Sequence, residues 1–156
     1  MEKQFEILRK TRGMLLSVVE GLSTEQLNQI PPGFNNNIIW NVGHIVAAQQ
    51  GVCYRRAGLP LIVDDAFFQK FKPDSKPEAP IDEAEIIRIK EMLFSTIDDL
   101  QKDYEAGKFT AYTPWVSRYS IAINNIEDAI SFLSFHDGLH VGYTMALKRA
   151  INAGSR

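Results

Sequence analysis

The chain has 156 residues, of which 45% are hydrophobic and 23% are charged, and its formal net charge is −2 at pH 7. This length and composition are typical of one globular domain with its own hydrophobic core. Nucleic-acid binders concentrate basic residues on one face, whereas the 17 lysine and arginine residues are scattered along this chain, so we expect no nucleic-acid partner.

Three further features bear on the compartment in which the protein works. No stretch approaches the roughly 18 apolar residues that a membrane-spanning helix needs. Acidic residues near the first residue are atypical of a secretory signal. The single cysteine, Cys53, has no partner for an internal disulfide, which is typical of a reducing compartment. We therefore expect a cytoplasmic protein with no membrane partner.

An amphipathic helix is predicted over residues 3–21, ending near Gly21. Its expected core stripe has spacings of three and four residues and consists of Phe5, Leu8, Arg12, Leu15, Val19 and Leu22. Ser23 is then expected to cap a short turn, and the motif Pro31-Pro32-Gly33 stops any helix.

The second helix is predicted from about Ile38 to Arg56, with an N-cap among the three asparagines of residues 35–37. On or near one of its faces lie Trp40, Asn41, His44, Ala47, Ala48 and Gly51. Beyond His44 this face is small and semi-polar, so it leaves room either for a ligand or for a closely approaching helix.

Residues 57–81 contain four prolines and form a long predicted connection. Within it, residues 64–71 are expected to make one or two helical turns. Their three phenylalanines are expected to pack on the bundle, rather than to form a flap over a cleft or a contact with a partner subunit. A third helix is predicted from a cap at Asp82 to Gly107, followed by a loop over residues 108–124 with at most a short extended piece.

The fourth helix is predicted from a cap at Asn124 or Asn125 to about Ala153. Four long helices without a convincing strand predict an all-α protein with a four-helix bundle. The sequence has no internal repeat and no low-complexity segment, so a single domain is predicted over residues 1–156.

Two histidines occupy positions of the fourth helix that are usually apolar. The expected core stripe, with spacings of three and four, consists of Leu133, His136, His140, Tyr143 and Leu147. Burial of an imidazole costs free energy unless its nitrogens find partners. A metal ion shared with His44, the one remaining histidine, would be such a partner, and three neutral imidazoles would leave at least one coordination position open. Hydrogen-bonded core histidines or surface histidines are the alternative.

Two neighbouring residues are assigned other roles. Asp137 stands where zinc proteases with a similar motif carry glutamate, and its shorter side chain would misplace a general base. We expect Asp137 either to be solvated or to orient a histidine ring from outside the metal site. Cys53 lies nine residues after His44, so it is expected on the opposite side of the helix as a small core or interface residue.

Small residues repeat every four positions on the side of the last helix away from the histidines, at Gly138, Gly142 and Ala146. Glycine inside a helix costs about 1 kcal/mol relative to alanine. We therefore expect a close contact to compensate, either within the bundle or with a helix of a second subunit.

The segment Asn36-Asn37-Ile38-Ile39-Trp40-Asn41-Val42-Gly43-His44, together with His136-x-x-x-His140-x-Gly142, resembles the DinB/YfiT superfamily over nearly the whole chain. The resemblance implies that family's variant of the up-and-down four-helix bundle, a divalent metal ion on His44, His136 and His140, and frequent dimers. Its characterised members include thiol transferases that use low-molecular-weight thiols and a maleylpyruvate isomerase. Relatives often carry glutamate where this chain has Asp137, so no catalytic role is transferred to that residue.

The resemblance and the residues together lead to one functional hypothesis and one rival. We expect a divalent-metal-dependent enzyme, of the thiol transferase or hydrolase type, that activates a thiol or water for attack on a small-molecule substrate. The ion would be zinc or nickel, or else iron, the cosubstrate a low-molecular-weight thiol, and the protein a homodimer. The pocket wall is assigned to Trp40, Trp115 and Tyr143, and catalytic residues are left unassigned. The rival is a non-catalytic dimeric stress-response or binding protein with a structural or vacant metal site.

Overall fold

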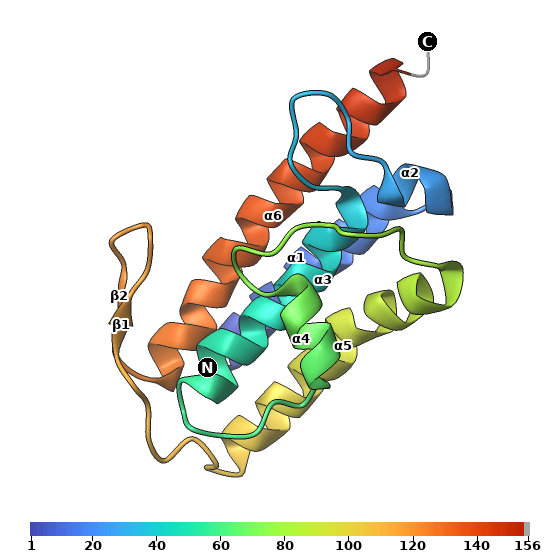
Figure 1. Cartoon of the computed structure of the whole chain (residues 1–156). Coiled ribbons are helices and arrows are strands. Elements are labelled where there is room, and N and C mark those ends of the chain that lie inside the picture. Colours follow the sequence, from blue (N-terminus) through green and yellow to red (C-terminus); the bar gives the residue numbers. More distant parts are fainter. Residues whose placement is uncertain (155–156) are drawn as a thin grey trace.

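Four long helices pack against one another in the computed structural model, which describes residues 1–154 (Figure 1). The long helices are α1 (Glu2–Val19), α3 (Ile38–Gln49), α5 (Glu83–Glu105) and α6 (Ile126–Gly154). The shorter elements are α2 (Thr24–Asn28), η1 (Gln50–Arg55), α4 (Asp65–Phe71), β1 (Trp115–Val116) and β2 (Ala122–Ile123). Residues 155 and 156, which the predicted domain includes, lie outside the described residues.

The four long helices form a ring in which α1 and α3 each pack against both α5 and α6. Side-chain contacts give the direction of each helix. The Arg12–Asp137 and Lys148–Val18 contacts make α6 parallel to α1. On the other side of the ring, Gln49 donates to the Thr96 carbonyl and Tyr54 to Asp103, so α3 and α5 are also parallel. The order is up-down-down-up, and the predicted all-α four-helix bundle is confirmed.

The helix starts follow the caps predicted at Ser23, among residues 35–37 and at Asp82, and α4 has a further cap at Asp64. The side chains of Ser23, Asn37, Asp64 and Asp82 each accept a hydrogen bond from a backbone N–H of the first turn that follows. These bonds satisfy donors that a helix start leaves without intrahelical partners. At the other end of α5, Gly107 has a φ of 67°, a left-handed conformation that glycine adopts without strain.

The long connection carries α4, which covers α3 (Figure 1). Its three phenylalanines, Phe67, Phe68 and Phe71, are at most 3% exposed, so the predicted packing on the bundle is confirmed. Phe71 lies directly over Gly43, where an added Cβ would be 2.6 Å from Phe71 Cδ1. A side chain at position 43 would therefore push α4 away from α3.

The core stripe of α6 differs from the predicted one. Asp137, Val141 and Thr144 are buried together with Leu133 and Leu147, whereas Tyr143 is 37% exposed and the two histidines are partly buried. The stripe thus runs through residues that neighbour the histidines. The predicted stripe was wrong because α6 packs against α1 as well as α3, and the contact with α1 selects a different set of positions.

A buried ion pair explains why Asp137 takes a core position. Arg12 Nε donates to Asp137 Oδ2 at 2.9 Å, and neither side chain has any exposed surface. Arg12 Nη1 also donates to the Leu93 carbonyl at 2.9 Å and to Thr96 Oγ1 at 3.2 Å, so the guanidinium joins α1, α5 and α6. Burial alone would raise the pKa of Asp137, but the adjacent Arg12 charge and His136 hold it below its ordinary value. The expectation of a solvated Asp137 was wrong.

The small-residue stripe of α6 faces away from the rest of the chain. An added Cβ at Gly138 or Gly142 would meet no side chain or neighbouring element of the described chain within 4 Å, and Ala146 is exposed. The expectation that these small residues make a close contact within the bundle is therefore wrong. Four large apolar residues of the same helix are 37–44% exposed: Phe135, Leu139, Tyr143 and Met145.

The connection between α5 and α6 contains two short strands. The predicted loop over residues 108–124 contains a two-stranded antiparallel hairpin in which Trp115 is opposite Ile123 and Val116 is opposite Ala122.

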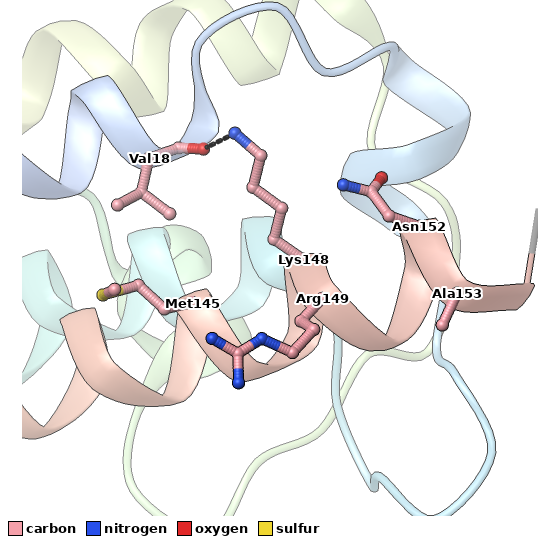
Figure 2. Close-up of a pocket in the computed structure, with 6 residues that line it drawn as sticks. All are labelled: Val18, Met145, Lys148, Arg149, Asn152 and Ala153. Atoms are coloured by element: carbon pink, nitrogen blue, oxygen red, sulfur yellow. Dashed lines mark hydrogen bonds between the residues drawn. The ribbon is translucent and has the colours of Figure 1, made fainter.

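Lys148 Nζ of α6 donates at 2.6 Å to the Val18 carbonyl, which is close to the end of α1 (Figure 2). A cation suits this position because the end of a helix leaves carbonyl oxygens unpaired. None of the described helices is both long and apolar enough to cross a membrane.

The first prediction concerns the buried Arg12–Asp137 ion pair. Asp137→Asn keeps the shape of the side chain but leaves the Arg12 guanidinium buried without a counter-ion. We expect the free energy of unfolding, measured with urea, to fall by about 3–5 kcal/mol. Glu6→Gln removes one partner of the exposed Lys3–Glu6 pair and should change stability by less than about 1 kcal/mol. Equal effects of the two substitutions would contradict the assignment of a structural role to the buried pair.

Candidate metal centre

The three histidines, which are distant in sequence, meet between α3 and α6. The centroid of the His44 ring lies 5.3 Å from that of His136 and 4.7 Å from that of His140, and the last two are 4.6 Å apart. One nitrogen of each ring can be chosen so that all three lie within 4.8 Å of one another. Nitrogens this close can share one ion, since a Zn–N bond is about 2.0–2.1 Å.

The first ring is oriented by α4. His44 Nδ1 lies 2.7 Å from the Phe71 carbonyl oxygen, and a carbonyl oxygen only accepts hydrogen bonds, so Nδ1 carries the proton. The lone pair of His44 is then on Nε2. The absence of a side chain at Gly43 allows Phe71 to approach α3 this closely. The sequence signal for this contact was the glycine immediately before the histidine.

Asn41 orients the second ring. His140 Nδ1 lies 2.8 Å from Asn41 Oδ1. The orientation of that amide is fixed because Asn41 Nδ2 donates to the Asn37 carbonyl at 2.7 Å and to Asn36 Oδ1 at 2.9 Å. Oδ1 must therefore accept from His140, which again leaves the lone pair on Nε2.

The third ring faces the buried carboxylate. His136 Nδ1 lies 3.5 Å from Asp137 Oδ1, the oxygen that does not bond to Arg12 Nε. All three rings thus have an oxygen acceptor on the Nδ1 side. A carboxylate or carbonyl on the second ring nitrogen is typical of histidines that bind a metal through the first. The three residues therefore fit a divalent ion, with Asp137 as an orienting partner outside the ligand set.

Burial keeps two of the rings neutral. It lowers the pKa of His44 to about 4, with a further contribution from the charge of His136. Burial likewise lowers the pKa of His140 to about 3, followed by the charges of His136 and His44. Both rings are uncharged at neutral pH, which is the form that binds metal ions.

The histidines line a cavity of about 610 Å³ together with Trp40 and Trp115, two of the residues assigned to the pocket wall. Trp40 stacks on His44 with ring centroids 4.7 Å apart and an angle of 12° between the planes. Tyr143, the third assigned residue, is not part of this lining. It contacts Phe34 edge-on instead, with centroids 5.5 Å apart. Cys53 is completely buried and also lies outside the lining.

The sequence interpretation missed several residues of the site. Asn41 was placed on the His44 face, and its position one turn earlier could have suggested the hydrogen bond to a metal-site histidine. Arg55, Arg56 and Arg118 line the same cavity. Arg55 belongs to η1, a π-helical segment at the end of α3, whereas a regular helix was predicted up to Arg56. Nothing in the local sequence distinguishes this segment from an α-helix.

A second hollow, of about 570 Å³, lies between α1 and the last turns of α6 (Figure 2). Its lining consists of Val18, Met145, Lys148, Arg149, Asn152 and Ala153. This set contains no histidine, cysteine or carboxylate, the side chains that most often bind metal ions in proteins, and Asn152 supplies its one side-chain amide. Its lysine is already bonded to the Val18 carbonyl. The histidine cavity is therefore the candidate functional site.

Comparisons with known proteins agree with this fold. The chain matches the DinB superfamily over residues 7–144. Its structure is similar to that of YfiT from Bacillus subtilis, described as "a probable metal-dependent hydrolase with an unusual four-helix bundle topology". The two share 17% sequence identity with a TM-score of 0.56, over 97% of this chain and 87% of YfiT. At this identity the likeness concerns the fold. No curated protein matches the chain.

The lowered pKa values predict a pH-dependent stability of the metal-free protein. An unfolded histidine binds a proton near pH 6.5, whereas His44 and His140 in the fold do so only near pH 4 and pH 3. The unfolded state therefore binds more protons as the pH falls below about 6.5. Below about pH 6.5 the free energy of unfolding should therefore fall by up to about 1.4 kcal/mol per pH unit for each of the two rings. Urea unfolding at pH values between about 7.5 and 5.5 measures this, with His140→Asn as the variant that should halve the slope. An unchanged stability over this range would contradict the neutral, buried state of the rings.

Proposed function

Because the chain belongs to the DinB superfamily, we propose that it is a divalent-metal-dependent enzyme that activates a thiol or water for attack on a small-molecule electrophile. The family membership inferred from the histidine motifs is confirmed by the match over residues 7–144. The observation that supports the proposal most is the convergence of three imidazoles whose Nδ1 atoms already face oxygen acceptors.

His44, His136 and His140 would hold the ion, through the nitrogen opposite each Nδ1. A divalent ion on three imidazoles supplies a Lewis acid with an open position, which lowers the pKa of a bound water or thiol and polarises a carbonyl group. Zinc, nickel and iron all suit imidazole ligands, and we propose zinc or nickel first. A reaction of the thiol transferase or hydrolase type uses this chemistry.

The other residues of the cavity position and shield the reacting groups. The Phe71 carbonyl and Asn41 hold two of the rings in one orientation and one tautomer. Trp40 and Trp115 supply apolar wall on the substrate side of the rings. A low-molecular-weight thiol as cosubstrate remains part of the proposal, and no residue is assigned as general acid or base.

The exposed face of α6 supports a homodimer, which is also the basis of the rival function. Glycine destabilises a helix relative to alanine, and no contact within residues 1–154 compensates for this at Gly138 or Gly142. Leu139, beside them, is 42% exposed. A second copy that packs α6 against α6 would cover both features. A non-catalytic dimeric binding or stress-response protein would need only this surface. The buried, unpaired Cys53 suits the proposed cytoplasmic location.

The metal site is tested by zinc binding. The protein purified without a histidine tag should retain about one ion per chain, whereas His140→Ala should lose affinity by 100-fold or more because one of three ligands is gone. Tyr143→Ala, one turn away and outside the cavity, serves as the control. Less than about 0.1 ion per wild-type chain after metal-replete expression would contradict the proposal and favour the non-catalytic rival.

Because Asn41 orients His140 without binding the ion itself, its loss should weaken metal binding less than the loss of a histidine. Asn41→Ala should weaken zinc binding by about 10–100-fold, which is the usual effect of losing a hydrogen-bond partner of a ligand. Asn152→Ala, in the second hollow, should leave zinc affinity unchanged. Thermal unfolding of both variants shows that the comparison is made between folded proteins. Equal zinc affinity of Asn41→Ala and wild type would contradict the orienting role.

The dimer is tested by the molar mass in solution. One chain has a mass of 17.6 kDa, so light scattering on a sizing column should give about twice this value. Leu139→Glu should shift the protein to the monomer by placing a charge in the interface. Ile87→Glu, at a similarly exposed apolar position of α5, should not. A wild-type monomer, or a dimer that Leu139→Glu leaves intact, would contradict the proposed α6 interface.

A further inference from the structure

The histidine cavity has a charge opposite to that of the whole chain. Three guanidinium groups line it, those of Arg55, Arg56 and Arg118, together with a single carboxylate, Asp74. The chain as a whole has a net charge of −2. A cleft lined mainly by charges of one sign attracts ligands of the opposite charge. This distribution is therefore informative about the substrate.

The π-helical segment η1 changes the side of the helix to which the two adjacent arginines point. In a regular α-helix, Arg56 is twelve residues after His44, which places it about 120° away around the axis. The wider turn of a π-helix accommodates an extra residue, and this gives Arg56 roughly the direction that residue 55 has in a regular helix, about 20° from His44. Arg56 is thereby turned toward the side of His44, and Arg55 lines the cavity as well. π-Helical turns are frequent at functional sites, and here the turn adds a cation to the site.

Aromatic rings support these two guanidinium groups. Arg55 Cζ lies 4.3 Å from the centroid of the Phe68 ring, and Arg56 Cζ lies 5.0 Å from that of Trp115. Within residues 1–154, neither side chain takes part in a hydrogen bond or an ion pair. A stacked guanidinium keeps the N–H groups at its edge available, in the planar arrangement that matches two oxygens of a carboxylate or phosphate.

Arg118 approaches the cavity from a different element, the turn that joins β1 to β2. Its only ion pair in the described chain is with Asp74 at 3.6 Å, and both side chains are well exposed, at 68% and 89%. Such a pair contributes little, so it leaves Arg118 free to bind another anion. A cation near the C-terminal end of a helix is stabilised by the helix dipole, and this is enough to explain Arg55. It does not explain Arg118, which lies outside any helix.

We propose that the cavity takes a small organic substrate that carries a carboxylate or phosphate group, which Arg56 and Arg118 bind while the reacting part of the molecule lies against the three histidines. The inference rests on the proposed function for the reaction, but the contribution of the arginines to anion binding does not. The two arginines act as binding residues that select an anionic substrate.

Benzoate, phenyl phosphate and neutral benzamide are the probes that test this, with binding to the zinc-loaded full-length protein measured by calorimetry. Benzoate or phenyl phosphate should bind at least about tenfold more tightly than benzamide, as expected for a charge-assisted hydrogen bond. Arg56→Gln and Arg118→Gln should each reduce that preference about fivefold or more, without changing zinc content or benzamide binding. Arg149→Gln, which removes the same charge in the second hollow, should behave as wild type.

Equal binding of the anions and benzamide, or anion binding that neither Arg56→Gln nor Arg118→Gln weakens, would overturn the inference. Both tryptophans of the chain line this cavity, so quenching of tryptophan fluorescence gives an independent readout of binding there. The same titrations on metal-free His140→Ala distinguish the two proposals. If the wild type binds no zinc but the arginine-dependent preference persists in metal-free His140→Ala, only the metal-dependent reaction is refuted, whereas bound zinc without the preference would refute only the anionic substrate. The tighter of the two anions identifies the group as carboxylate or phosphate.

Discussion

The site depends on one constraint, which is that each imidazole buried between α3 and α6 needs an oxygen acceptor for its Nδ1 proton. The Phe71 carbonyl and the Asn41 amide supply two of these acceptors at 2.7 and 2.8 Å, and Asp137 faces the third ring. An imidazole that donates through Nδ1 presents its lone pair on Nε2. Within residues 1–154 no protein group donates to these three lone pairs, and a cation is the partner that satisfies all of them together. The same burial keeps His44 and His140 neutral, so the protein does not have to release protons from these rings when it binds an ion near pH 7.

The bundle holds this arrangement through contacts that are themselves buried and polar. Arg12 connects α1 to α5 and to Asp137 of α6, and Asp137 is the residue next to the candidate ligand His136. A change in the packing of α1 would therefore be transmitted to the metal centre through one carboxylate. On the other side, Gly43 allows Phe71 to approach α3, so the position of α4 sets the orientation of His44. The candidate ligands come from two helices, but five helices determine their geometry.

Local features of the sequence predicted much of this structure. The caps at Ser23, Asn37, Asp64 and Asp82 were predictable because each bond spans only three residues. The histidine set was predictable because the spacing of four residues and the single remaining histidine left few combinations. The core stripe of α6 was not, because Asp137 is buried by a residue 125 positions away. For the same reason Tyr143 was assigned to the wrong surface. The π-helical turn at Gln50–Arg55 has no local signature, so the arginines of the cavity became apparent only in three dimensions.

The central claim is that His44, His136 and His140 bind one ion together. X-ray absorption spectroscopy of the zinc-loaded protein tests it directly, because it reports the number and type of atoms bound to the metal. The account predicts three imidazole nitrogens at about 2.0–2.1 Å, with an exchangeable oxygen ligand such as water completing the site. A spectrum with fewer than three imidazoles, or with sulfur at about 2.3 Å from Cys53, would contradict it.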